Sequence, residues 1–170
     1  LSVVSDLLGM AVDLPSPLDK PASASWPMRY ETTTVRNASP RGSAGLQDQL
    51  QFSLGQVLSA RYWRDTSGPS PTVLRGWLQL GATNPAKDMP DGNTVAWQIR
   101  QPSLNLDDWQ PVLNQWMGED NAAQSSSAGR SALASYMPQR IDLQTASLTW
   151  SSRSFTQTQV LAERQSRQWR

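Results

Sequence analysis

Apolar and polar residues alternate along much of the chain with the two-residue period of a β-strand that buries one face. The alternation is clearest at residues 50–54, 57–64, 72–80 and 94–100. Residues 26–35 continue the extended pattern, because their consecutive threonines add β-branched side chains. Each of these segments predicts a strand.

The N-terminal part and the connections are less regular. Residues 2–14 predict two short strands, and the prolines within residues 15–25 predict an extended surface loop because they interrupt hydrogen bonding between strands. Residues 36–45 and 81–92 are rich in Gly, Pro, Asn, Asp and Ser and predict loops.

The C-terminal part is again extended. Residues 141–143 and 148–150 alternate out of phase, which a β-bulge near residues 145–146 would reconcile. Residues 155–170 predict a last long strand.

One segment has helical spacing. Apolar residues recur every three to four positions at Trp109, Val112, Leu113 and Trp116. Asp107 is placed to cap the first N–H groups, so a helix is predicted over residues 108–117, with Pro111 tolerated in its first turn. Residues 118–130 are low in hydrophobicity and predict a mobile linker.

These elements predict a mainly β fold, an antiparallel meander that forms a curved, twisted sheet or groove, half-barrel-like, with one short helix. The part after the linker is too short to bury a core of its own. Residues 1–170 are therefore expected to form a single β-rich domain.

Composition excludes several kinds of chemistry. The chain has no histidine and no cysteine, which excludes disulfides, the common zinc sites and Ser/His/Asp or Cys/His catalysis. Its formal net charge of +1 gives no reason to expect nucleic acid as a partner. The adjacent carboxylates Asp107 and Asp108 are explained by helix capping. We expect no enzyme, cofactor or metal, although a glycosidase-like carboxylate site is compatible with the composition.

The alternating apolar positions have two interpretations. They most often form a closed core, but they can also line an open groove that accepts acyl chains, and periodicity does not distinguish the two. If the groove exists, we expect one face of each central strand to line it, with the residues Leu50, Phe52, Leu54, Leu74, Leu78, Leu80, Val95, Trp97 and Ile99.

The start of the chain bears on its origin. It begins at Leu1 and contains no apolar run long enough for a membrane span or a signal peptide. We therefore expect a processed or excised part of a longer protein, whose compartment this segment does not indicate.

Several short motifs resemble a known family. Residues 5–9 (SDLLG) and 14–21 (LPSPLDKP) are similar to a segment toward the C-terminal side of large AsmA-like, YhdP-type envelope proteins of Gram-negative bacteria. Residues 74–77 (LRGW) and 106–113 (LDDWQPVL) resemble the family's next landmarks, in the same order. Residues 141–169 resemble the repeated strand pairs of that region.

The resemblance implies a segment of a long periplasmic protein, anchored in the inner membrane, whose stacked strands form a groove between the two membranes. Members of the family are implicated in phospholipid transport to the outer membrane and in its integrity as a barrier. The implied partners are phospholipid or acyl chains and neighbouring repeats of the parent chain, with membrane contact only through other parts of the protein. The alternative is a non-enzymatic spacer module whose open strand edges pair with neighbouring repeats or with a partner.

Overall fold

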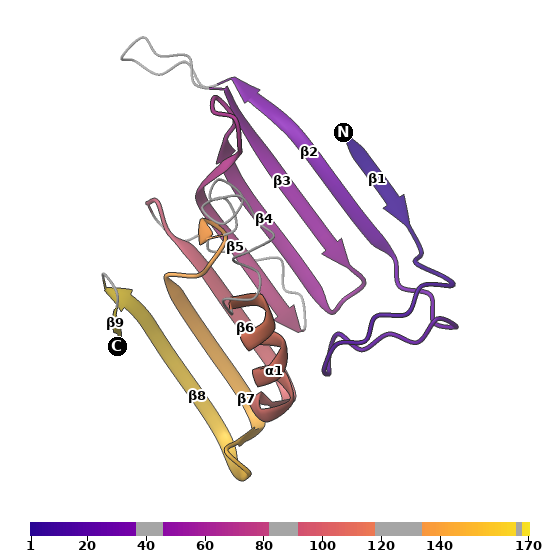
Figure 1. Cartoon of the computed structure of the whole chain (residues 1–170), viewed down its shortest axis with the longest axis vertical. Helices are drawn as coiled ribbons and strands as arrows, with labels where there is room; N and C mark the ends of the chain where they lie inside the picture. The colour runs from indigo at the N-terminus through magenta and orange to yellow at the C-terminus, as the bar shows by residue number, and fades with distance from the viewer. Residues whose placement is uncertain (37–45, 82–91, 118–133, 166–167) are drawn as a thin grey trace.

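A computed structural model describes residues 1–36, 46–81, 92–117, 134–165 and 168–170. All the named strands belong to one open mixed sheet and follow each other across it in chain order (Figure 1). They are β1 (Ser2–Ser5), β2 (Met28–Arg36), β3 (Leu46–Leu54), β4 (Leu58–Asp65), β5 (Thr72–Gly81), β6 (Val95–Asn105), β7 (Arg140–Trp150), β8 (Arg153–Gln165) and β9 (Gln168–Trp169). The mainly β fold class is confirmed.

Strand direction departs from the expected antiparallel meander at two places. Strands β1 to β5 and β7 to β9 pair antiparallel, but β6 runs parallel to both β5 and β7. A parallel pair needs a crossover connection, and the helix α1 (Leu106–Met117) belongs to the connection from β6 to β7. Alternation shows which face a residue occupies and not which way a strand runs, so the sequence did not reveal these reversals.

The helix is present, but its N-terminus differs from the prediction. It begins at Leu106, and its cap is Asn105, whose Oδ1 accepts the backbone N–H of Asp107 at 3.1 Å. Pro111 lies in the second turn rather than the first, where its ring removes a backbone hydrogen bond.

Asp107 holds a distant turn instead of capping the helix. Its two carboxylate oxygens accept the backbone N–H groups of Ser151 and Ser152 at 2.7 and 2.8 Å. These serines form the two-residue loop between β7 and β8 with φ angles of 52° and 57°, a left-handed conformation that costs free energy for any residue other than glycine. The carboxylate therefore stabilises a strained hairpin against the start of α1.

The N-terminal prediction was partly wrong. Residues 2–14 contribute β1 and then only an isolated bridge between Val12 and Lys20, while the rest of residues 6–27 is a loop as the prolines indicated. At the other end, the predicted last strand is divided into β8 and β9. The predicted loop at 36–45, the loop at 81–92 and the linker at 118–130 fall largely outside the described residues.

The phase change expected near residues 145–146 is present in a different form. The strand pairings of β6, β7 and β8 leave out Pro102, Ala146 and Gln157 at one level of the sheet, with no change of register on either side. Leu143 and Leu148, which strict alternation would place on opposite faces, are both buried in one cluster. The pairing is therefore interrupted at the same level in all three strands, whereas a β-bulge would add a residue to one strand only.

The Asp107 contact is testable. Replacing Asp107 with alanine removes two charge-assisted hydrogen bonds at a partly exposed site, so we expect a loss of about 1 kcal/mol in the free energy of unfolding in urea. Hydrogen exchange at the Ser151 and Ser152 amides should accelerate. The control variant Asp108→Ala removes a carboxylate that accepts a hydrogen bond from the Asn105 side-chain amide and contacts neither serine in the described structure. In this variant the Ser151 and Ser152 amides should keep their protection. Equal exchange in both variants would contradict the assignment.

Candidate functional site

The strand register brings most of the predicted lining residues onto one side of the sheet. Phe52, Leu78 and Trp97 lie in one row across the strands, and Leu54, Leu80 and Ile99 lie in the next. A third row joins Leu50 to Val95 through Tyr62 and Gly76. We call this side the apolar face and define it by Leu50, Phe52, Leu54, Leu58, Ala60, Tyr62, Leu78, Leu80, Val95, Trp97, Ile99, Ile141 and Leu143.

Leu74 is the exception among the predicted residues. The register between β4 and β5 shifts after Trp63, so that Arg64 pairs with Val73 and Leu74 has no partner on β4. Val73, and not Leu74, packs against the buried cluster of Ala60, Tyr62 and Val95. A β-bulge adds one residue to a strand and reverses the faces beyond it, which simple alternation cannot anticipate.

The apolar face is only partly covered. Leu50, Phe52, Leu54, Leu78 and Trp97 are half-buried, and no large side chain in the described part of the chain is fully buried. A single sheet with α1 over part of one face leaves apolar side chains open to contact from outside.

A buried ion pair borders the apolar face at one end of its strands. Arg64 Nε donates to Asp48 Oδ1 at 2.8 Å, a second guanidinium nitrogen bonds the other carboxylate oxygen, and both residues are buried. Arg64 also donates to the phenol oxygen of Tyr136 at 3.1 Å. The hydrogen bond with Asp48 raises the pKa of Arg64 further above its ordinary value. Through Tyr136, these contacts connect the segment before β7 to strands β3 and β4, which lie far from it in sequence.

The Tyr62 ring lies against this cluster. Its centroid is 5.0 Å from that of Tyr136 in an edge-to-face arrangement. A Cβ atom at Gly76 would come within 2.1 Å of the Tyr62 ring, so glycine is required for the two strands to hold the ring there. Burial raises the pKa of the Tyr62 phenol from 10.0 to about 12.

At the other end of the strands the border is formed by α1 and the N-terminal loop, residues 6–27. Leu106 and Trp109 of α1 pack against Leu104, Leu143 and Leu148. The Trp109 indole N–H donates to the carbonyl oxygen of Ser16 at 3.0 Å, so the tip of the loop reaches the helix (Figure 1).

The N-terminal loop has its own internal support. Lys20 is 2% exposed, and its ammonium donates to the carbonyl oxygens of Met10 at 2.7 Å and Pro21 at 3.2 Å. Backbone hydrogen bonds join Val12 to Lys20 in both directions. The loop is therefore a hydrogen-bonded hairpin at this border rather than an unstructured connection.

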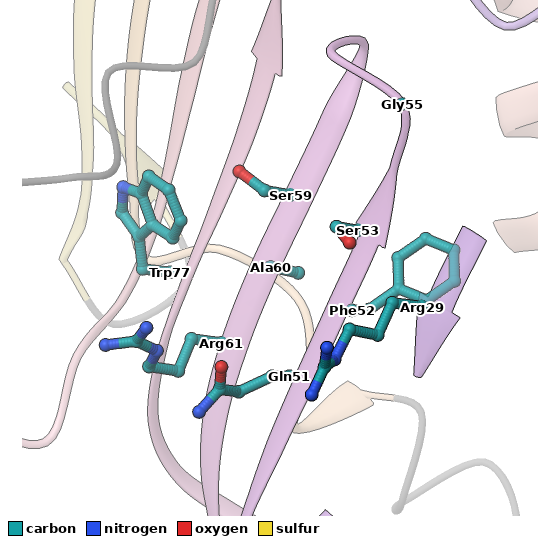
Figure 2. A pocket seen from close by; sticks show the side chains of 9 residues that line it. All are labelled: Arg29, Gln51, Phe52, Ser53, Gly55, Ser59, Ala60, Arg61 and Trp77. Atoms are coloured by element: carbon teal, nitrogen blue, oxygen red, sulfur yellow. The ribbon is translucent and has the colours of Figure 1, made fainter. Parts of the chain in front are cut away.

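The opposite side of the sheet is polar. It carries Arg29, Gln51, Ser53, Ser59, Arg61 and Trp77, which line a depression of about 360 Å³ together with Phe52, Gly55 and Ala60 (Figure 2). None of these residues was predicted from the sequence to form a site. Asp48, Arg64 and Tyr136 were not predicted either, although a charged residue at an apolar-phase position of a strand is a signal for such a buried pair.

Two further observations concern chemistry and membranes. Among the residues that the structure describes, no group of His, Cys, Asp and Glu side chains could hold a metal ion. Within the same residues, no helix has the length and apolar character needed to cross a bilayer.

The buried ion pair gives a stability prediction. Asp48→Ala leaves the Arg64 guanidinium buried without its counter-ion, so we expect the free energy of unfolding to fall by about 3–5 kcal/mol. The matched control Glu31→Ala breaks the exposed pair with Arg29 and should cost less than about 1 kcal/mol. Urea unfolding of both variants measures the difference, and similar losses would show that the Asp48 pair is not desolvated.

The Tyr62 phenol gives a pH prediction. Because its folded-state pKa is raised, the phenol costs no stability below pH 10, where it is neutral in both states. As pH rises from about 10 to about 12 only the unfolded state ionises, so stability should fall by about 2–3 kcal/mol. Urea unfolding between pH 8 and pH 11 measures this slope. It should be shallower in Tyr62→Phe than in the parent protein, and parallel slopes would refute the burial of the phenol.

Comparison with known proteins gives one result. No curated protein and no solved structure matches the chain. The family model described as YhdP protein matches residues 1–170, the whole of the sequence, in agreement with the resemblance carried by the short motifs. The chain belongs to the YhdP family.

Proposed function

We propose that the apolar face binds the acyl chains of phospholipids, as part of a periplasmic envelope protein that carries lipid between the inner and outer membranes and maintains the outer-membrane barrier. Membership of the YhdP family supports this proposal, because that is the role implied for AsmA-like proteins. The observation that carries it for this chain is the continuous row of apolar residues across β3 to β7, which are half-buried apart from the buried Ala60.

The direction of the row fits a sliding ligand. Phe52, Ala60, Leu78, Trp97 and Ile141 follow each other from strand to strand, about 4.8 Å apart, at right angles to the strands. An acyl chain lying along this row contacts a new strand every few methylenes. Each methylene removed from water contributes about 0.8 kcal/mol, so the interaction grows with the length of the chain in contact.

Transport of this kind needs no chemistry on the lipid. The headgroup stays in water while the chains move over side chains of similar polarity, so the barrier at each step is small. The proposal therefore assigns no catalytic residue to the chain.

The second candidate is a spacer module, favoured by one observation at the sheet edge. Strand β8 has 13 residues. In the described residues, Arg164 and Gln165 pair with β9 and Glu163 exchanges backbone hydrogen bonds with Arg170, while Phe155, Val160 and Leu161 are exposed. An edge of this kind accepts another strand. Neighbouring repeats of the parent chain are the partner that this alternative requires.

Native mass spectrometry separates the two candidates. The purified protein is incubated with phosphatidylethanolamine and phosphatidylglycerol, and lipid that co-purifies is extracted and identified. Stoichiometric phospholipid adducts support the groove. A clean unliganded mass, under conditions in which a control lipid-binding protein stays loaded, favours the spacer.

Leu78→Asp tests the apolar face directly. A carboxylate at the centre of the row should lower phospholipid occupancy at least tenfold and leave cooperative thermal unfolding in place, because Leu78 is only half-buried. The control Leu161→Asp makes the same replacement at a leucine that is 55% exposed on β8 and should leave occupancy unchanged. Loss of cooperative unfolding in Leu78→Asp would identify a closed core instead of a groove.

A further inference from the structure

The polar face carries an arginine, Arg61, that no carboxylate of the described residues neutralises. Most arginines of this face are neutralised by a carboxylate or stacked on an aromatic ring, in the pairs Arg29–Glu31, Arg100–Asp142, Arg140–Glu163 and Arg75–Trp63. Arg61 is exposed, and in the part of the chain that the structure describes it forms no ion pair with any carboxylate. The guanidinium cannot lose its charge at physiological pH, so it presents a permanent cation.

Arg61 lies in the depression of about 360 Å³ on the polar face. The strand register places it directly between Gln51 on β3 and Trp77 on β5. Arg29 stands on β2, on the other side of β3, in register with Ser53. Figure 2 shows these side chains on adjacent strands around the hollow.

The spacing of the strands suits a ligand held from both sides. Strands β2 and β4 lie about 10 Å apart across β3, and an arginine side chain reaches several ångströms from its backbone. Arg29 and Arg61 can therefore both reach a group seated over Gln51 and Ser53. Glu31 pairs with Gln51 across the strands and forms an ion pair with Arg29 at 2.8 Å. Arg29, Glu31 and Arg61 together therefore carry a net charge of +1.

The donor set defines the ligand class. Guanidinium groups only donate hydrogen bonds, and the amide of Gln51 and the hydroxyl of Ser53 can also donate. A ligand that satisfies them must be rich in acceptors and negatively charged. Phosphate esters meet both requirements, and arginine binds them with two parallel hydrogen bonds.

We propose that the depression lined by Arg61, Arg29, Gln51 and Ser53 binds a phosphate ester, on the face of the sheet opposite the apolar row. The ester can belong to a phospholipid headgroup or to a small soluble molecule, since the recognised chemistry is the same. The proposal does not rest on the acyl-chain proposal, because its four polar residues lie on the face opposite the apolar row.

The soluble source is tested with glycerol phosphate. Titration of the ¹⁵N-labelled protein is followed through the Trp77 indole N–H signal, which should shift and saturate. In Arg61→Gln the apparent Kd should rise at least tenfold. The matched control Arg75→Gln removes an exposed arginine of the same strand pair outside the depression, and its Kd should stay within a factor of two of the parent value. Unchanged thermal unfolding of both variants excludes a folding defect.

The lipid source is tested by co-sedimentation with vesicles of phosphatidylcholine containing one-third phosphatidylglycerol. The site is supported if Arg61→Gln loses binding to these vesicles and Arg75→Gln keeps it. If glycerol phosphate does not bind, this result identifies a lipid headgroup as the ligand. Saturable glycerol phosphate binding with the same variant pattern supports it with a soluble ester.

Two results would overturn the proposal. Binding to neither probe would do so, and so would equal weakening in Arg61→Gln and Arg75→Gln, which would indicate diffuse attraction to positive charge. Neither result affects the acyl-chain test, because Leu78→Asp changes the other face.

Discussion

The rest of the structure depends on one constraint, which is that the described fold is a single layer. A sheet buries a face only when a second layer packs on it, and here α1 covers part of one face beside β6 and β7. Apart from Ala60, the residues of the apolar row from Phe52 to Ile141 therefore stay half-buried. The same alternation that closes the core of a two-layer protein leaves most of this row half-buried among the described residues, and the lipid-binding proposal rests on that partial exposure.

A single layer must also be stabilised differently from a closed core. Its buried clusters are small, and specific polar contacts tie together segments that are distant in sequence. Arg64 joins β4 to both Asp48 and Tyr136, and Asp107 joins α1 to the hairpin between β7 and β8. Both contacts lie toward the ends of the strands, where they hold the borders of the apolar face and leave its centre free of charge.

The strand pattern could be predicted from the sequence because a two-residue period is a local signal. Eight of the nine predicted lining residues share one face for that reason. The bulge that displaces Leu74 depends on the pairing of β5 with β4, and the parallel direction of β6 depends on its two neighbouring strands. Asp107 contacts Ser151 and Ser152, which lie 44 and 45 residues further along the chain. The arginine at position 64 was visible as a charge in an apolar phase, but its partners Asp48 and Tyr136 become neighbours only when the sheet is assembled.

Alternation also separates the two proposed binding chemistries without any further device. Along β4, Ala60 and Tyr62 face the apolar row while Ser59 and Arg61 face the polar depression, so neighbouring residues serve opposite sides. A charge placed at position 61 costs nothing in desolvation, whereas a charge one residue further along would disrupt the buried cluster. A one-layer sheet can therefore evolve a polar site and an apolar surface on the same strands independently, since the backbone between them isolates one set of side chains from the other.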